Sequence, residues 1–122
     1  MVDNLASDAS KTAIQTAKQN LAGTHLNLAD AYKDLGEKGE ARRYYEMAVA
    51  LFEDTPKPEH WSTAHCMQSL AAFLEKEGDF GEAVLRLKRG LEICKIIYIH
   101  DHRDTIMIRD TIARLEAKVQ LV

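Results

Sequence analysis

The sequence is poor in cysteine and proline, and it has no long apolar run. Cys66 and Cys94 lack a CxxC spacing, so the sequence predicts small core residues rather than a disulfide framework or a redox site. Pro56 and Pro58 fall together and predict one break between helices. No stretch approaches the roughly 18–20 apolar residues that a membrane-spanning helix needs, which predicts no membrane partner.

An excess of basic charge and the common catalytic motifs are also missing. The formal net charge is −3, and basic residues alternate with acidic ones, which argues against nucleic-acid binding. A glycine-rich phosphate loop, a nucleophile elbow and a paired-acid motif are all lacking, so we predict no enzyme activity and no cofactor. Met1 leads into Asp3, Asn4 and Asp8 rather than a signal peptide, and we therefore predict a cytoplasmic protein.

An internal repeat is the strongest positive feature. The segment GEKGEA at residues 36–41 is answered by GDFGEA at residues 78–83, 42 positions later. The interval is used twice upstream, as listed here: Leu28-Ala29, Leu70-Ala71 and Ile112-Ala113. A fixed period of this size is typical of solenoids, in which each unit covers the apolar face of its neighbour. The sequence therefore begins three copies of one unit.

Apolar residues recur at helical spacing on both sides of each glycine pair. The predicted core stripes are Leu28, Ala31, Tyr32, Leu35; Ala41, Tyr44, Tyr45, Ala48, Val49, Phe52; Met67, Leu70, Ala71, Leu74; and Ala83, Val84, Leu87, Leu91, Cys94, Ile97. The Gly-x-x-Gly segments predict tight turns between paired helices, with Glu40 and Glu82 in the first turn of the second helix. Asn20, Ser62 and Asp104 are predicted to cap the first helix of each copy.

The arrangement resembles the tetratricopeptide repeat, a helix-turn-helix unit with fixed large, small and aromatic positions. The matching residues are His25, Leu28, Ala29, Tyr32, Ala41, Tyr45, Ala48; Met67, Leu70, Ala71, Leu74, Ala83, Leu87, Gly90; and Arg109, Ile112, Ala113. The 42-residue interval exceeds the common 34 and looks like the longer variant of kinesin light chains. The resemblance implies an all-α, right-handed superhelix of antiparallel hairpins, a TPR-like α-solenoid of about two and a half repeats. The predicted divisions are a leading helix or cap at 1–19, repeats at 20–61 and 62–103, and a capping helix at 104–122.

The resemblance implies a non-catalytic adaptor that holds a peptide of a protein partner in a concave groove of first helices. The implied groove residues are Leu26, Asn27, Asp30, Lys33 and Asp34; His65, Gln68, Ser69, Ala72, Glu75 and Lys76; and Met107, Asp110, Thr111, Arg114 and Lys118. Asn27, Ser69 and Thr111 lie 42 residues apart and could form a polar ladder for a peptide backbone. Ordinary exposed polar residues on amphipathic helices would explain the same pattern.

Two alternatives stay open at this point. His100, Asp101, His102 and Asp104 could be drawn as a metal site, but His102 repeats His60 after 42 residues, which favours a structural role such as capping the preceding helix or covering the next one. We expect no metal. The second alternative is a scaffold that self-associates through exposed solenoid ends, for example as a homodimer, because about three repeats are needed for a stable solenoid.

Overall fold

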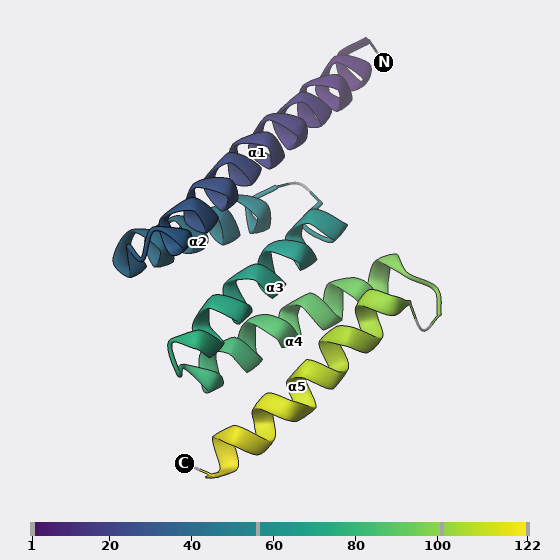
Figure 1. The fold of residues 1–122 in the computed structure, drawn as a ribbon. Coiled ribbons are helices and arrows are strands. Elements are labelled where there is room, and N and C mark those ends of the chain that lie inside the picture. The colour runs from purple at the N-terminus through teal and green to yellow at the C-terminus, as the bar shows by residue number, and fades with distance from the viewer. Residues whose placement is uncertain (1, 56, 101, 122) are drawn as a thin grey trace. The chain divides into compact units, whose positions relative to one another are not determined.

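The computed structural model describes the backbone of residues 2–55, 57–100 and 102–121 and the side chains of residues 8–55, 57–100 and 102–120. These residues form five helices, α1 (Val2–Asp34), α2 (Lys38–Glu53), α3 (Trp61–Lys76), α4 (Phe80–Ile97) and α5 (Arg103–Leu121) (Figure 1). The chain divides into two compact units, Met1–Pro58 and Glu59–Val122. The first unit is the hairpin α1·α2, and the second packs α3 on α4 and α4 on α5. The predicted all-α fold of about two and a half helical hairpins is confirmed.

The 42-residue interval of the sequence reappears in the positions where helices begin. Lys38 begins α2 and Phe80 begins α4, while Trp61 begins α3 and Arg103 begins α5. The first helices of the two hairpins also end 42 residues apart, at Asp34 and Lys76. Corresponding residues of successive copies therefore occupy corresponding places on corresponding helices.

Glycine closes the first helix of each hairpin in the same way. Gly36 and Gly78 adopt positive φ values of 80° and 82°, which glycine tolerates without the strain of a Cβ. The N–H of Glu37 donates to the carbonyl of Tyr32, and the N–H of Asp79 donates to that of Leu74, both at 2.9 Å. These bonds satisfy carbonyls that a helix end would otherwise leave without partners. The predicted Gly-x-x-Gly turn is confirmed in both units.

Histidines, rather than the predicted Asn20, Ser62 and Asp104, lie at the starts of the first helices. The Nδ1 atom of His60 accepts from the backbone N–H of Ser62 at 3.1 Å, and His102 accepts in the same way from Asp104, also at 3.1 Å. Asn20 lies inside α1, which continues without a break from residue 2. The prediction was wrong because a histidine ring with a free Nδ1 lone pair can satisfy an orphan N–H as a serine or aspartate oxygen does. The recurring histidine is structural, as expected, but it caps the following helix.

The core of the second unit follows the predicted stripes. Met67, Leu70 and Leu74 of α3 are almost completely buried, as are Ala83 and Leu87 of α4. Gly90, which occupies a small-residue position of the repeat, is buried where a Cβ would lie 3.5 Å from the Cβ of Met67. Small residues at such positions let two helices approach closely. Both cysteines are buried free thiols, and burial raises the pKa of the Cys94 thiol, so the core assignment of the cysteines is confirmed.

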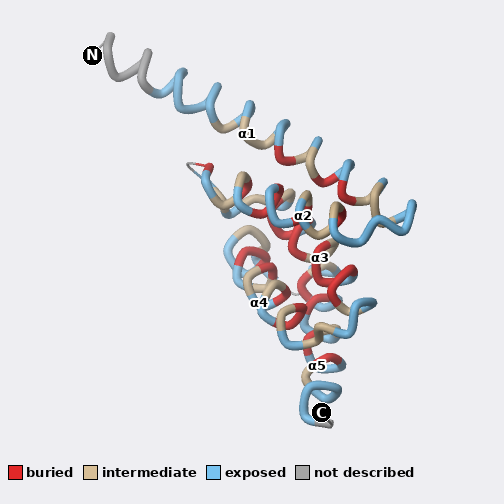
Figure 2. The backbone as a smooth tube through the Cα atoms, turned by 90° about the vertical axis from the view of Figure 1, so that its left-hand side faces the viewer, coloured by how far each residue is buried: buried red, intermediate tan, exposed pale blue. Residues whose placement is uncertain are grey.

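The stripe predicted for α1 was wrong. Leu28 is 38% exposed and Leu35 is 74% exposed, whereas Ala22, Leu26 and Ala29 are buried (Figure 2). Within its unit α1 packs only against α2, so only one of its faces can be covered by that hairpin. The sequence pattern could not reveal which of two apolar stripes that face would be. In contrast, the α2 stripe is confirmed, with Ala41, Tyr45, Ala48, Val49 and Phe52 all buried.

The segment between α2 and α3 is the predicted break, and it contains Pro58. Pro56 and Asp101, which the sequence analysis also singled out, lie outside the described residues. Within the described part of the chain, every helix is too short or too polar to cross a membrane.

Candidate functional site

A groove lies in the second unit between the two first helices α3 and α5. Its volume is about 220 Å³. It is lined by Gln68, Ala71, Ala72 and Glu75 of α3, Leu87 of α4, and Met107, Ile108, Thr111, Arg114 and Leu115 of α5. Because α3 and α5 belong to successive copies of the repeat, the groove repeats the geometry expected between first helices of a solenoid.

The floor of the groove is apolar and fully packed. Ala71, Leu87, Ile108 and Leu115 are each at most 3% exposed, so their inner atoms belong to the core and only their outer surfaces meet the groove. The alanine on α3 contributes the depth, since it fills less space than the leucine and isoleucine opposite. The floor can therefore accept an apolar side chain without rearranging the core.

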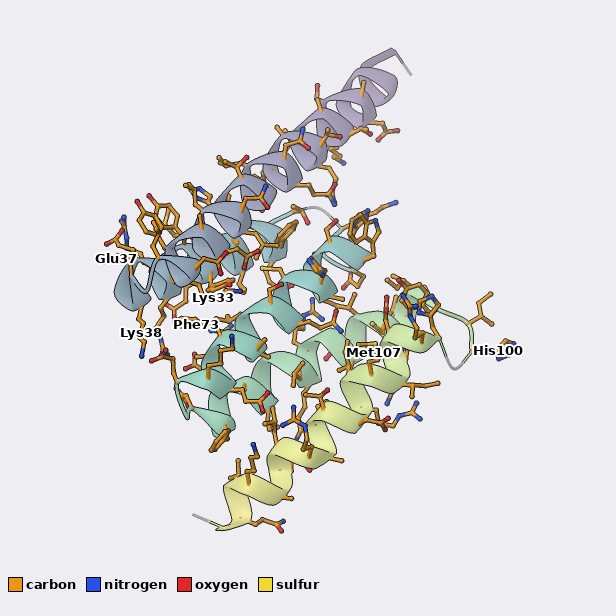
Figure 3. The ribbon with its side chains drawn as sticks, in the orientation of Figure 1. Lys33, Glu37, Lys38, Phe73, His100 and Met107 are labelled. Atoms are coloured by element: carbon orange, nitrogen blue, oxygen red, sulfur yellow. The ribbon has the colours of Figure 1, made fainter. Side chains whose placement is uncertain are left out.

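The rim of the groove is polar and comes from residues that the sequence analysis assigned to binding. Gln68 and Thr111 are half-buried, while Ala72, Met107 and Arg114 are exposed. Met107 extends from the first half of α5 (Figure 3). An apolar floor below polar rim groups is the usual composition of a site that buries one part of a ligand and orients the rest by hydrogen bonds.

An ion bridge joins the two walls. The guanidinium of Arg114 donates to both carboxylate oxygens of Glu75, through Nη1 to Oε2 at 2.5 Å and through Nη2 to Oε1 at 3.1 Å. Lys118 adds a longer contact, with its Nζ 3.7 Å from Oε2 of Glu75. Donation by Arg114 lowers the pKa of Glu75, and the same contact raises the pKa of Arg114. Both groups are therefore charged at neutral pH and fix the distance between α3 and α5.

The bridge predicts a pH dependence of the stability of the second unit. The folded-state pKa of Glu75 lies below the ordinary value of 4.5, so its contribution is present above that value and is lost as pH falls through the folded-state pKa. We expect Glu75→Gln to lower the thermal midpoint by about 1–4 °C at pH 7 and to have no effect near pH 3, as measured by circular dichroism melts.

The matched control for the bridge is Glu59→Gln, which neutralises an exposed glutamate outside the groove. Its melting curve should coincide with that of the unaltered protein at both pH values. A loss of stability in Glu75→Gln that is equally large near pH 3 would show that the bridge is not its cause.

The predicted polar ladder is only partly placed at the groove. Thr111 lines it, but its Oγ1 donates to the carbonyl of Met107 at 2.8 Å, so only its acceptor capacity is left for a ligand. Ser69 is half-buried and is not among the lining residues. Asn27 is exposed on α1 of the first unit. The ladder as a whole stays a prediction.

The residues predicted on α1 divide between the surface and the hairpin. Leu26 is only 7% exposed, so it is a core residue and not an accessible groove side chain, contrary to the prediction. Asp30 accepts a hydrogen bond from the hydroxyl of Tyr45, a fully buried residue of α2, and lies 3.8 Å from Nζ of Lys33. A buried tyrosine needs a partner for its hydroxyl, which gives Asp30 a structural role. Asn27 and Asp34 are exposed.

The remaining predicted residues of the second unit lie outside the groove lining. His65, Lys76 and Asp110 are exposed on α3 and α5. At the other end of the unit, His100 projects from the loop between α4 and α5 (Figure 3), and the ring of His102 stacks on Tyr98 with centroids 3.7 Å apart. Among the described side chains, no three histidine, cysteine, aspartate or glutamate residues gather in a way that could hold a metal ion.

Comparison with known proteins gives one finding on identity. The tetratricopeptide repeat family profile matches residues 20–96, which is more than half of the chain. The match begins inside α1 and ends near the end of α4. A search of curated proteins finds no significant match. Modules of this repeat are generally protein–protein interaction domains, and the hairpins, the glycine turns and the 42-residue spacing agree with the profile. The chain belongs to the tetratricopeptide repeat family.

Proposed function

We propose that this protein is a non-catalytic adaptor that binds an extended peptide segment of a partner protein in the groove between α3 and α5. The observation that carries the proposal is the groove itself, in which six residues expected to bind a peptide stand over a packed apolar floor. These six are Gln68, Ala72, Glu75, Met107, Thr111 and Arg114.

The size of the groove favours a peptide over a small molecule. At about 220 Å³ it is smaller than the roughly 300–1,000 Å³ of most small-molecule sites. A cavity of this size suits one apolar side chain of a longer ligand, whose backbone then lies along the rim. Gln68 can both donate to and accept from such a backbone, and Thr111 can accept from it. An extended peptide presents the free N–H and C=O groups that these side chains need.

The charges around the groove favour a peptide of mixed polarity. Glu75 is already neutralised by Arg114 and Lys118, so the rim does not present a strong field of either sign. A strongly acidic tail would find no cluster of free cations on this rim. The selected peptides should therefore carry an apolar anchor residue flanked by polar residues, without a run of one charge.

The polar ladder and the longer repeat variant complete the proposal. Asn27, Ser69 and Thr111 would extend backbone recognition to each first helix. The 42-residue interval, preserved in the helix starts, supports a place among the longer repeats that resemble kinesin light chains. Two buried free thiols support a reducing compartment, and we propose the cytoplasm.

The test is a selection of binders from a displayed random peptide library, followed by calorimetric titration of the best peptides. We expect Ala72→Arg to fill the groove and weaken binding at least about 10-fold, because the arginine side chain occupies the space of the anchor residue. Ala113→Arg is the matched control, since Ala113 is also an exposed alanine but lies on α5 outside the groove lining. Equal affinities of the two variants would reject the groove as the binding site.

The same titrations separate the ladder from the groove. Replacing Asn27 and Thr111 together by alanine should reduce affinity while leaving the melting curve almost unchanged, because neither residue is part of the core. Unchanged affinity in this double variant would remove the ladder from the proposal and leave the groove untouched.

A further inference from the structure

A second apolar face lies on α1, away from its hairpin partner. Ile14, Ala17, Leu21, Thr24, Leu28 and Ala31 are all exposed, and we call these six residues the leading seam. They follow one another at alternating intervals of three and four residues, the spacing of helices that pack along their length. Leu35, which is 74% exposed, continues the same series by one step. In a chain with 29% charged residues, the absence of charge from this series marks a packing surface.

The hairpin does not use this face. On α1, Gln15 bonds to Lys57, Lys18 forms an ion pair with Asp54 at 2.8 Å, and Ala22 and Ala29 are buried. These residues form a stripe that is distinct from the leading seam. The hydroxyl of Thr24 donates to the carbonyl of Asn20 at 3.1 Å within α1, so its donor is already satisfied and it adds little polarity to the seam.

The repeat shows that this face is built for helix packing. Two intervals of 42 residues place Leu21, Thr24, Leu28 and Ala31 at the positions of Thr105, Ile108, Ile112 and Leu115 on α5. Those four residues of α5 are buried, each at most 8% exposed, and α5 packs against α4. Ile108 lies next to Gly90 of α4, 3.6 Å from where a Cβ would be. The leading seam is thus the face that packs on a neighbouring helix elsewhere in this chain.

We propose that the leading seam is covered by the α1 helix of a second copy of this chain, packed antiparallel across a two-fold axis. The large and small residues of the seam alternate, and an antiparallel pairing opposes Ile14 to Ala31, Ala17 to Leu28 and Leu21 to Thr24 of the other copy. Each of the six resulting layers then contains one large and one small residue. Such layers interdigitate without voids, whereas a parallel pairing in register would set small against small and large against large.

The flanks of the seam permit this self-pairing. Ala13, Asn20 and Asn27 border it on one side and carry no charge. On the other side Lys18 is neutralised by its ion pair with Asp54. Antiparallel packing would bring Asn20 near Asn27 of the other copy, where the two amides can exchange hydrogen bonds. Because the same patch serves both copies, the interface is isologous and closes at a dimer. The dimer is independent of the peptide groove, which lies on the second unit.

Sedimentation equilibrium of the full chain tests the interface. We expect a dimer, and we expect Leu21→Glu combined with Leu28→Glu to raise its dissociation constant at least about 100-fold, because the substitutions place charges in four apolar layers. Thr16→Glu is the matched control, since Thr16 is exposed on α1 outside the seam, and it should leave the dimer intact. Circular dichroism must show equal helix content in all three proteins. A monomeric unaltered protein, or a dimer that survives the double substitution, would overturn the proposal.

Cysteine cross-linking tests the direction of the helices. Mixing the variants Ala17→Cys and Leu28→Cys should give an oxidised heterodimer, because these positions face each other in the antiparallel pairing. Neither variant should cross-link alone, since two copies of position 17 would lie about 16 Å apart along the helix axis. Efficient cross-linking of Ala17→Cys with itself would contradict the antiparallel arrangement.

Discussion

Replacing Leu70 by alanine is expected to lower the free energy of unfolding by about 2–5 kcal/mol. Leu70 of α3 is fully buried, so the change removes apolar contacts and leaves a cavity that close-packed neighbours cannot fill. The loss is large against the roughly 5–15 kcal/mol that stabilise a typical domain. Chemical denaturation followed by circular dichroism measures it as a shift of the unfolding midpoint.

Leu85→Ala provides the matched control for this cavity. Leu85 lies in the same unit, on α4, but is 64% exposed, so the same loss of side-chain atoms should change the free energy of unfolding by at most about 0.5 kcal/mol. If both variants lost the same free energy, helix propensity rather than burial would explain the effect, and the assignment of Leu70 to the core would be wrong.

The contrast between these two leucines shows why much of the fold could be predicted. In α3 and α4 the repeat fixes which positions meet a neighbouring helix, so Leu70 and Leu87 could be assigned to the core and Leu85 could be left out of it. The turns were equally predictable, because a glycine at Gly36 and Gly78 has a stereochemical reason that depends only on the local backbone.

The first helix could not be predicted in the same way. α1 carries two apolar stripes, and only contact with α2 decides that Ala22 and Ala29 face the hairpin while Leu28 stays exposed. Apolar periodicity identifies a face that can be buried, but it does not identify the neighbour that buries it. The stripe that misled the prediction is the same one that we assign to a second copy of the chain.

The candidate site shows the same division. Glu75 and Arg114 could be placed on first helices from the repeat, but their ion bridge depends on the distance between α3 and α5. The apolar floor was missed as part of the site because Ala71 and Leu87 satisfied every expectation for core residues. A groove wall in a solenoid of paired helices is one side of the core, so burial alone does not separate structural residues from binding ones.

The two glycines of the second turn are expected to respond in opposite directions to alanine. Gly78 has φ of 82°, a conformation that costs an L-residue about 1–2 kcal/mol, so Gly78→Ala should lower the free energy of unfolding by that amount. Gly81 lies in the first turn of α4, where alanine is the better helix former, and Gly81→Ala should change stability by between zero and a gain of about 1 kcal/mol.

Steric crowding does not complicate this comparison, because a Cβ built at either glycine meets no atom within 4 Å. Denaturant unfolding of the two variants therefore isolates the cost of a left-handed backbone. Gly36→Ala repeats the test in the first unit, where φ is 80° and the surroundings are equally open. Because the repeat places the same backbone conformation at both positions, the losses at Gly36 and Gly78 should agree within about 0.5 kcal/mol. A neutral Gly78→Ala variant would mean that this turn can relax out of the left-handed region, and that the first glycine of each pair is not what ends the helix.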